Sequence, residues 1–498
     1  MPIFLKTKKL DLSTGGDPLV VLNEIEAETF GIQAGDRVEL VWPGTKGLVA
    51  MVELSHSRVN RGEIGLWREV WQPAKIKNDV TIKLKQLSRP PSIQAIKKKL
   101  LGKELSYEEI HSIISDIVEN RLSPVEMTYY VASGFVKENT DDELYYLSKA
   151  IAETGEQMNL PNEVVDKHSV GGVPGNRTTM IVTPIIASLG LTMPKTSSRA
   201  ITSPAGTADT MEVLAPVTFS MPEIRAIVKK TGACLVWGGG LSIAPADDRI
   251  IKLSRPLALE PYDKMIVSIM AKKVAMGVDY LVIDMPTGPT AKIHSEKTAS
   301  LLEEKFMYLG RKFGMKVKVI KTLAREPVGS AVGPALEARD VLRVLQRKAM
   351  RPQDLEDKGV YLAGELLELK GFCKRGEGKR IAQQQLDNGA AWHKMQEIIS
   401  AQGGNPNIDS EAVATSAYHY EIHAESSGKV TLVDNKAINE VCMNLGAPHE
   451  RLAGLHLHVR FGEQVEKGAK LFTLYAPTQG RLELGRKALE GMPIITIR

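Results

Sequence analysis

The chain has 498 residues, more than a single hydrophobic core usually serves, so about three domains are expected. Its net charge of +5 is small and its basic residues are interspersed with acidic ones, which argues against a nucleic-acid partner and suits a small anionic substrate. The 3 cysteines lie far apart without metal-ligand spacing, which argues against a disulfide framework or a zinc site. No apolar run matches a signal peptide or a bilayer span, so a soluble cytoplasmic protein without a membrane partner is expected.

The N-terminal part of the chain predicts two small domains. Residues 1–86 contain β-rich segments separated by turns with glycine, which is typical of a β-barrel-like domain. Residues 88–160 predict a helical domain, because three segments begin with a Ser or Thr that stands three residues before a glutamate, as in a capping box. The capping residues are Ser106, Ser123 and Thr140. Part of 249–277, which includes a helix predicted over 263–276, is expected to return to this domain.

The remaining chain predicts an α/β fold. Over 161–350, short apolar strands alternate with loops and helices, which indicates a mostly parallel sheet whose ligands bind beyond the carboxyl ends of its strands. Residues 351–498 predict a C-terminal α+β domain with hammerhead-like turns but no exposed carrier lysine. The expected fold class is therefore α/β, with a helical lobe, a mostly parallel α/β lobe, the N-terminal barrel-like domain and the C-terminal α+β region.

The stretch from Asp166 to Thr179 is the most informative part of the sequence. It follows a short predicted strand and leads into a helix predicted from Asn176 onward. Its glycines let the backbone approach an anion, and free N–H groups at a helix N-terminus favour negative charge. Lys167 adds a cation, and Ser169 and Thr179 add hydroxyl donors. The spacing of the glycines and the residues after them do not fit a nucleotide-binding P-loop, so we expect a different kind of anion site.

A second loop, over 195–209, follows the next strand and places several hydroxyl groups around Arg199. It ends at a predicted helix start, where Thr207 is either an N-cap or an anion ligand. We expect this loop to form a second wall of the anion site.

These loops resemble a known family. The segment 166–172 resembles the phosphate-binding motif of the pyrimidine nucleoside and thymidine phosphorylases, and further similar segments follow in the same order to the C-terminus. They lie at 242–247, 268–273, 335–337 and 401–404. The resemblance implies a pentosyltransferase that uses inorganic phosphate as co-substrate, without cofactor or metal, to break the N-glycosidic bond of a nucleoside. It also implies a homodimer or a higher homo-oligomer.

The resemblance implies a role for individual residues. Six of them hold the attacking phosphate: Lys167, Ser169, Gly172, Thr179, Ser197 and Thr207. His168 is expected to give a proton to the leaving base. Ser268 and Lys272 are expected to contact the base from the helical domain.

The loop 198–203 differs from that of the short thymidine phosphorylases, which also lack an N-terminal barrel. In both features the chain resembles the archaeal AMP phosphorylases and the long type 2 thymidine phosphorylases. The likeness to AMP phosphorylases implies that Glu260, in place of an aspartate, is the proton donor, and that Lys292 binds the nucleotide. The same likeness places a loop against the nucleotide: Ser198, Arg199, Ala200, Ile201, Thr202 and Ser203. In a competing interpretation, Arg199 packs against Asp209 and never touches ligand.

Four functions remain open on the sequence. The segment 286–292 is more similar to the type 2 enzymes, so the first expectation is a thymidine phosphorylase-like enzyme that gives free base and (deoxy)ribose 1-phosphate. The alternative is an AMP phosphorylase that acts on nucleoside 5′-monophosphates and gives base and ribose 1,5-bisphosphate. The third, of another class, is a catalytically inactive nucleotide-binding regulatory protein. A phosphoribosyltransferase of the anthranilate type has a similar layout but would bind pyrophosphate through Mg²⁺.

Overall fold

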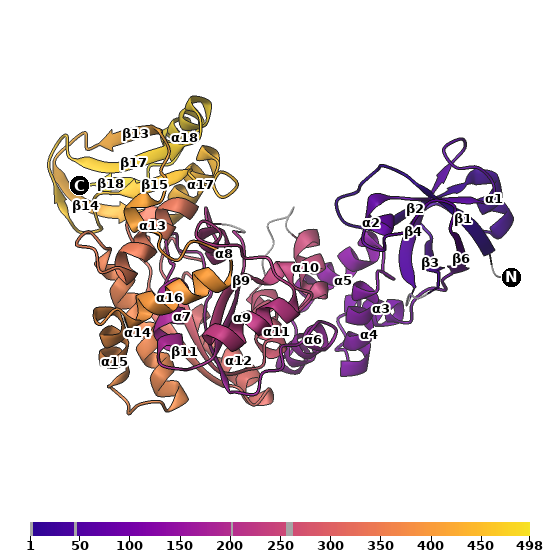
Figure 1. The fold of residues 1–498 in the computed structure, drawn as a ribbon, viewed down its shortest axis with the longest axis horizontal. Helices are drawn as coiled ribbons and strands as arrows, with labels where there is room; N and C mark the ends of the chain where they lie inside the picture. The colour runs from indigo at the N-terminus through magenta and orange to yellow at the C-terminus, as the bar shows by residue number, and fades with distance from the viewer. Residues whose placement is uncertain (1–2, 44–46, 201–202, 255–261) are drawn as a thin grey trace. The chain divides into compact units, whose positions relative to one another are not determined.

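The computed structural model describes residues 3–43, 47–200, 203–254 and 262–498. The chain forms two compact units (Figure 1): Met1–Thr154 with Pro245–Asp263, and Gly155–Ala244 with Lys264–Arg498. Glu260, Ile201 and Thr202 of the predicted site lie outside the described residues. Among the described residues, no helix is both long and apolar enough to span a bilayer.

The first unit begins with a closed six-stranded barrel in the order β1-β5-β2-β4-β3-β6. The strands are β1 (Ile3–Lys9), β2 (Leu19–Asn23), β3 (Arg37–Val41), β4 (Leu48–Ser55), β5 (Glu63–Leu66) and β6 (Thr81–Gln86), with short helices α1 (Glu24–Phe30) and α2 (Arg68–Trp71) between them. Alternate side chains such as Val38 and Leu40 point inward and are fully buried. The prediction of a barrel-like N-terminal domain is therefore confirmed.

Helices make up the rest of the first unit. They are α3 (Ser92–Leu100), α4 (Tyr107–Val118), α5 (Pro124–Val136), α6 (Asp141–Glu153) and α10 (Pro245–Ser254). All three predicted capping boxes are present: the side chains of Ser106, Ser123 and Thr140 each accept from the backbone of a glutamate whose carboxylate returns to the cap. A buried ion pair, Lys99 to Glu143 at 2.8 Å, ties α3 to α6.

The second unit contains the expected parallel sheet. Its strands are β7 (Val164–Ser169), β8 (Met193–Ser197), β9 (Ala233–Trp237), β10 (Val278–Thr287) and β11 (Lys316–Leu323). Strands β11, β10 and β7 form one parallel group and β8 and β9 another. A parallel bridge between Val164 and Thr192 joins the two groups, so the strand order is β11-β10-β7-β8-β9. This order puts β7, with the predicted anion loop at its carboxyl end, in the middle of the sheet.

Helices cover the sheet. They are α7 (Thr179–Ser188), α8 (Thr207–Met211), α9 (Met221–Thr231), α11 (Tyr262–Ala275), α12 (Glu296–Lys312), α13 (Pro334–Leu345), α14 (Gln353–Lys370), α15 (Gly378–Asp387) and α16 (Ala390–Ala401), with 3₁₀ turns at Gly238–Gly240 and Ser410–Ala412. Helix α7 begins at Thr179, three residues later than predicted from Asn176. Leu355, Leu386 and Ile399 share one apolar core with Ile181 of α7. The α/β core thus extends beyond the expected boundary at residue 350, because α14 to α16 bury their apolar faces on it.

The C-terminal part has its own apolar core. A four-stranded sheet has the order β12-β15-β17-β13, and a three-stranded one has the order β16-β14-β18. The elements are β12 (Ala331–Val332), β13 (Tyr418–His423), β14 (Gly428–Val433), α17 (Asn435–Leu445), β15 (Gly454–Leu457), β16 (Gln464–Val465), β17 (Lys470–Ala476), α18 (Gln479–Gly491) and β18 (Ile495–Ile497). Because β12 directly precedes α13 and pairs with β15, it joins this sheet to the α/β core.

Candidate active site

Strand β7 separates two groups of polar side chains. Successive side chains of a strand point to opposite faces, so Lys167 and Ser169 share one face of the sheet, and Asp166 and His168 share the other. Asp284 of β10 pairs with Ser169 in the parallel register and therefore lies on the face of Lys167. The groups predicted to hold phosphate and to meet the base thus occupy opposite faces of one strand, next to each other at its carboxyl end.

The lysine on the first face is completely buried. Lys167 Nζ donates to Thr178 Oγ1 at 2.7 Å and to Thr179 Oγ1 at 3.4 Å, at the N-terminus of α7. Its ammonium group and the two hydroxyls therefore converge where the helix dipole favours an anion. Thr178, which makes the shorter contact, was not singled out from the sequence.

The glycines after β7 have backbones that other residues rarely adopt. Gly171 and Gly172 have φ of +91° and +84°. A Cβ on Gly172 would lie 2.7 Å from Cβ of Lys292, so the loop passes directly against the predicted nucleotide-binding lysine. Any larger residue at 172 would push the two apart.

A buried carboxylate, Asp284, organises the same face. It accepts hydrogen bonds from Ser169 Oγ at 2.9 Å and Thr322 Oγ1 at 2.7 Å, and it pairs with Lys358 Nζ of α14 at 3.1 Å. Burial acts to raise the pKa of Asp284, but Lys358 and Lys167 lower it to about 2. Asp284 is therefore an anion that orients the Ser169 hydroxyl and balances the charge of the lysines. The sequence signal for it was its place at the carboxyl end of a predicted strand.

An ion pair between Arg177 and Glu337 joins the anion loop to two other helices. Arg177 Nη1 donates to Thr207 Oγ1 at 3.0 Å and Nη2 donates to the carbonyl of Ala205 at 2.7 Å. Glu337, on α13, is 1% exposed and also accepts from Thr210 Oγ1 of α8. Thr207 is thus held against Arg177, in the loop between β7 and α7. Ser197 Oγ, at the end of β8, is buried and has no hydrogen-bond partner among the described residues, which leaves it available to a ligand.

The loop after β8 is fastened to the start of α8. Asp209 accepts from the backbone N–H of Ala200 at 2.7 Å and of Gly206 at 2.8 Å. Arg199 pairs with Asp209 at 3.1 Å and with both oxygens of Glu212 at 2.7 Å, and its guanidinium stacks over Trp237. Two carboxylates therefore match its charge. This geometry agrees with the competing interpretation, in which the Arg199 side chain supports the loop.

Two other residues of this loop are described. The carbonyl of Ser198 accepts from the N–H of Ala208 at 3.3 Å, and Ser203 Oγ donates to the carbonyl of Ala205 at 2.9 Å. Both serines are thus held to the segment that leads into α8.

The second face of β7 carries a buried charge cluster. Asp166 lies between Lys195 Nζ at 3.1 Å and Lys273 Nζ at 2.6 Å. Burial acts to raise the pKa of Asp166, but Lys195 and Lys273 lower it, so it remains an anion. Burial lowers the pKa of His168 well below its usual value, and the lysines around it, with Lys273 first, lower it further. His168 is therefore a neutral imidazole in the free chain.

Helix α11 brings the predicted base-binding residues to this face. Lys272 Nζ donates to Ser268 Oγ at 3.2 Å, as expected for residues four apart on a helix. Lys273 on the same helix pairs with Asp166, which holds α11 on the α/β core. Ser268 and Lys272 thus belong to the second unit, whereas the sequence predicted them in the helical domain. The part of the segment 249–277 up to Asp263 does belong to the first unit, with the helical domain.

The protonation of Lys167 gives a testable pH dependence. Burial, with Lys358 and Arg177 adding to it, lowers the pKa of Lys167 to about 8, although Asp284 acts in the opposite direction. We expect kcat/KM for phosphate to fall above about pH 8, by about tenfold per pH unit, because the free lysine then loses its charge. Initial rates over pH 6 to 10 at low phosphate measure this.

The matched variant is Lys167→Met. It should have a higher KM for phosphate at neutral pH and should lack the alkaline fall. An alkaline fall that persists in Lys167→Met would assign the titration to another group.

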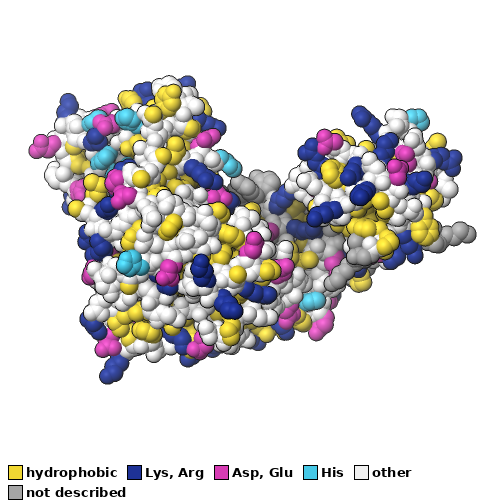
Figure 2. Space-filling model, viewed as in Figure 1, with side chains coloured by type: hydrophobic (Ala, Val, Ile, Leu, Met, Phe, Trp, Pro, Cys, Tyr) yellow, Lys and Arg dark blue, Asp and Glu magenta, His cyan; other side chains and the backbone are white. Residues whose placement is uncertain are grey.

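The charges on the surface agree with the sequence expectation. Figure 2 shows basic and acidic side chains interspersed over the visible face. Among the described residues, no group of three or more His, Cys, Asp or Glu side chains is arranged to hold a metal ion.

Comparisons with known proteins match the chain in three parts. Residues 161–392 match the glycosyl transferase family a/b domain, and residues 93–155 match the helical bundle domain of the same family. Residues 429–493 match the pyrimidine nucleoside phosphorylase C-terminal domain.

Curated relatives match almost the whole chain. The AMP phosphorylase of Thermococcus kodakarensis is 43% identical over 96% of this chain and 94% of its own length. The AMP phosphorylases of Pyrococcus furiosus and Methanocaldococcus jannaschii are 42% and 40% identical over 96% and 97% of this chain, and over 94% and 95% of their own lengths. These relatives support the AMP phosphorylase alternative better than the thymidine phosphorylase-like expectation.

A solved structure matches the fold alone. Anthranilate phosphoribosyltransferase of Thermus thermophilus superposes with a TM-score of 0.51 at 17% identity, over 62% of this chain and 99% of its own. The layout that suggested a phosphoribosyltransferase is therefore shared, while the sequence similarity lies with the phosphorylases.

Proposed function

The chain belongs to the glycosyl transferase family that includes the AMP phosphorylases, and from this premise we propose that it cleaves nucleoside 5′-monophosphates with inorganic phosphate. The products would be the free base and ribose 1,5-bisphosphate. The observation that carries the proposal is the similarity to AMP phosphorylases over 96% of the chain, barrel included. An inactive regulatory protein fits less well, because Lys167, Ser169 and the glycines between β7 and α7 remain in a built anion site.

The attacking phosphate is proposed to bind on the Lys167 face. Lys167, Thr179 and Ser169 supply a cation and two hydroxyls, and the N-terminus of α7 adds its dipole. These groups hold the anion beneath the anomeric carbon of the ribose, where proximity and electrostatic stabilisation lower the barrier to attack. A phosphate oxygen then forms the new C–O bond as the C–N bond to the base breaks, and the bonding electrons pass to the base.

The base leaves more easily if a proton reaches it. A neutral His168 can donate an N–H hydrogen bond to the developing negative charge, but it has no extra proton to give. We therefore assign the proton transfer to Glu260, which lies outside the described residues. His168 is assigned the hydrogen bond to the leaving base. Ser268 and Lys272, on the same side of the sheet, are proposed to orient the base.

A nucleotide substrate brings a second anion, its 5′-phosphate. We assign this group to Lys292, whose backbone lies against Gly172. The loop 198–203 is assigned to the part of the nucleotide that AMP and adenosine share. Lys167 and Lys292 then address different phosphates on either side of the same glycine turn.

The test is a panel of AMP, CMP and UMP against adenosine, cytidine, uridine and thymidine, assayed for base release. Release should depend on phosphate and be unaffected by EDTA. We expect kcat/KM to favour the monophosphates by about 10–150-fold, since a charge-assisted contact contributes about 1.5–3 kcal/mol. An enzyme that uses the nucleosides equally well would refute the nucleotide substrate, and one without release from any of them would support the regulatory alternative.

Arg199→Met tests how the loop recognises the nucleotide. Because Asp209 and Glu212 already hold the Arg199 guanidinium, we expect the variant to lower kcat/KM for AMP and adenosine together, by about tenfold, through a loosened loop. The ratio of the two values should stay within about twofold of the wild type. Arg451→Met is the matched control, because Arg451 pairs with the same Glu212 at 3.0 Å from a more exposed position. A selective loss of AMP activity in Arg199→Met would instead mean that this arginine binds the 5′-phosphate.

A further inference from the structure

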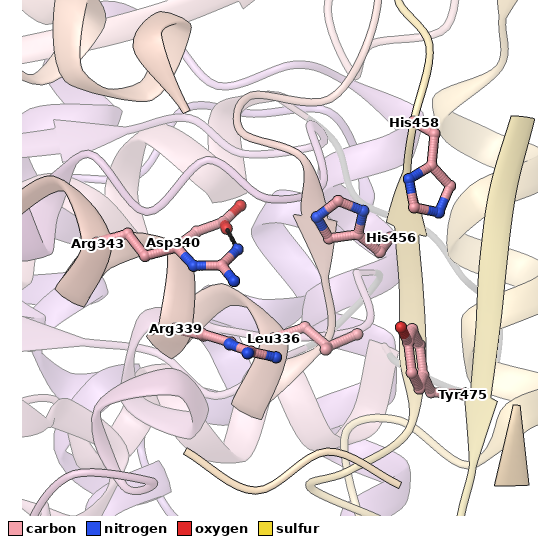
Figure 3. A pocket seen from close by; sticks show the side chains of 7 residues that line it. All are labelled: Leu336, Arg339, Asp340, Arg343, His456, His458 and Tyr475. Carbon is pink, nitrogen blue, oxygen red and sulfur yellow. Dashed lines mark ion pairs between the residues drawn. The ribbon is translucent and has the colours of Figure 1, made fainter. Parts of the chain in front are cut away.

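A cavity of about 150 Å³ lies between α13 and the C-terminal sheet. Arg339, Asp340 and Arg343 line it from α13, and His456 and Tyr475 line it from β15 and β17. Figure 3 shows these side chains turned toward a common space, with His458 beside His456. The rings of the two histidines are 4.9 Å apart.

This cavity is separate from the phosphate loop. Its α13 residues recur every three or four positions, so they share one face of the helix. Glu337, which holds Arg177 of the loop, lies on a different face of α13. The loop residues from Asp166 to Thr179 do not line the cavity.

Two buried polar atoms of the lining side chains have no partner. Among the described residues, neither Arg339 Nε nor His456 Nδ1 makes a hydrogen bond, although both atoms are buried. An unsatisfied buried polar group costs about 1–3 kcal/mol, so such pairs of atoms usually have a ligand or ordered water. The Tyr475 hydroxyl is a further donor in the same wall.

Two arginines and one carboxylate, Asp340, line the cavity. Burial, together with His458, Arg343, Arg460 and Arg339, lowers the pKa of His456 to about 4, so this ring is neutral. Asp340 accepts from the backbone N–H groups of Ser330 and Ala331 at 3.0 Å, at the start of β12.

A carboxylate at the edge of the cavity already uses part of the arginine pair. Glu411 bonds to Arg339, and to Arg343 Nε at 2.7 Å. Arg339 Nε is buried without a hydrogen-bond partner among the described residues, and Arg343 Nη1 lies 3.6 Å from Asp340. The arginines therefore accept an oxyanion, and Glu411 occupies only one side of them.

We propose that this cavity is a further anion site, distinct from the two phosphate positions proposed for the reaction, which binds a phosphate group through Arg339, Arg343, His456 and Tyr475. Its volume is about that of five water molecules, which accommodates a phosphate group but not a nucleoside. The group comes either from inorganic phosphate or from a phosphomonoester whose organic part stays outside. The proposal does not depend on the reaction at the other site.

Binding stoichiometry of the full chain tests the proposal. In equilibrium dialysis with radiolabelled inorganic phosphate, the wild-type chain should bind one phosphate more than Arg339→Met, and the phosphate that Lys167→Met loses should be a different one. Arg339→Met should weaken the phosphate of the cavity by at least about tenfold, whereas Arg486→Met, which removes a partly exposed arginine of the same unit, should retain the wild-type number. Ribose 5-phosphate, titrated in parallel, identifies the source of the phosphate group. If only this ester binds, and Arg339→Met abolishes its binding, the site is one for phosphomonoesters.

A second variant keeps the test decisive if Arg339→Met does not fold. Glu411→Gln removes the competing carboxylate and should tighten the phosphate of the cavity severalfold without affecting the phosphate at Lys167. An equal number of bound phosphates in the wild type and in Arg339→Met, with neither inorganic phosphate nor ribose 5-phosphate responding to Arg339→Met or Glu411→Gln, would overturn the proposal.

Discussion

His168→Ala is expected to lower kcat by about 10²–10³-fold and to leave the phosphate KM within about threefold of the wild type. His168 and Lys167 are neighbours in sequence but lie on opposite faces of β7, so loss of the imidazole leaves the phosphate face intact. A hydrogen-bond donor placed where charge develops acts mainly in the transition state, so its loss appears in kcat. Steady-state kinetics with each substrate varied in turn measure the split.

Two variants sharpen this experiment. His168→Gln retains an N–H donor and should recover part of the lost turnover, whereas exposed His294→Ala should behave as the wild type. The pKa of His168 is far below its usual value. We therefore expect the pH profile of kcat/KM near pH 6.5 to be the same in His168→Gln as in the wild type. Near-normal turnover in His168→Ala, or loss of an ionisation near pH 6.5 in His168→Gln, would contradict the role of a neutral donor.

Local signals account for what the sequence predicted well. A capping box is written within four residues, so Ser106, Ser123 and Thr140 could be recognised without the fold. The same holds for the glycine turn at 171–172, where positive φ excludes most other residues. The strands of the parallel sheet were predicted from their apolar runs, as in β8 (Met193–Ser197).

Contacts between distant residues account for what the sequence missed. Asp284 contacts Ser169 across 115 positions, and Glu337 contacts Arg177 across 160, so no local pattern links the partners. Such pairs depend on strand order, which places β10 beside β7, and on the packing of α13. The assignment of α11 to the second unit was missed for the same reason. This helix packs on the α/β core through the buried contact of Lys273 with Asp166, which are distant in sequence.

The two expectations for the substrate differ in how much of the chain supports each. The segment 286–292 is short, and its resemblance to type 2 thymidine phosphorylases was outweighed by similarity to AMP phosphorylases over 479 residues. Arg199 was the obvious charge for a second phosphate in the sequence, yet its two carboxylate partners become visible only in the fold. A charged side chain therefore indicates an anion site only after its internal partners are known.

Arg177→Met is expected to lower the free energy of unfolding by about 3–5 kcal/mol, because it leaves Glu337 as an unpaired charge in the core. Burial already raises the pKa of Glu337, although Arg177 acts to lower it. Without Arg177 this pKa rises further above its unfolded value. Urea denaturation at neutral pH measures the loss.

The sign of the pH dependence follows from that raised pKa. Where the folded-state pKa of a carboxyl group exceeds the unfolded one, the folded chain binds more protons, and stability falls as pH rises between the two values. The deficit of Arg177→Met relative to the wild type should therefore be largest at neutral pH and should shrink on acidification toward pH 5, as Glu337 takes up a proton. The double variant Arg177→Met with Glu337→Gln should regain part of the stability at pH 7 and lose this dependence on acidification. A deficit that stays constant from pH 7 to 5 would mean that Glu337 finds another partner, and the loop would then not owe its position to this ion pair.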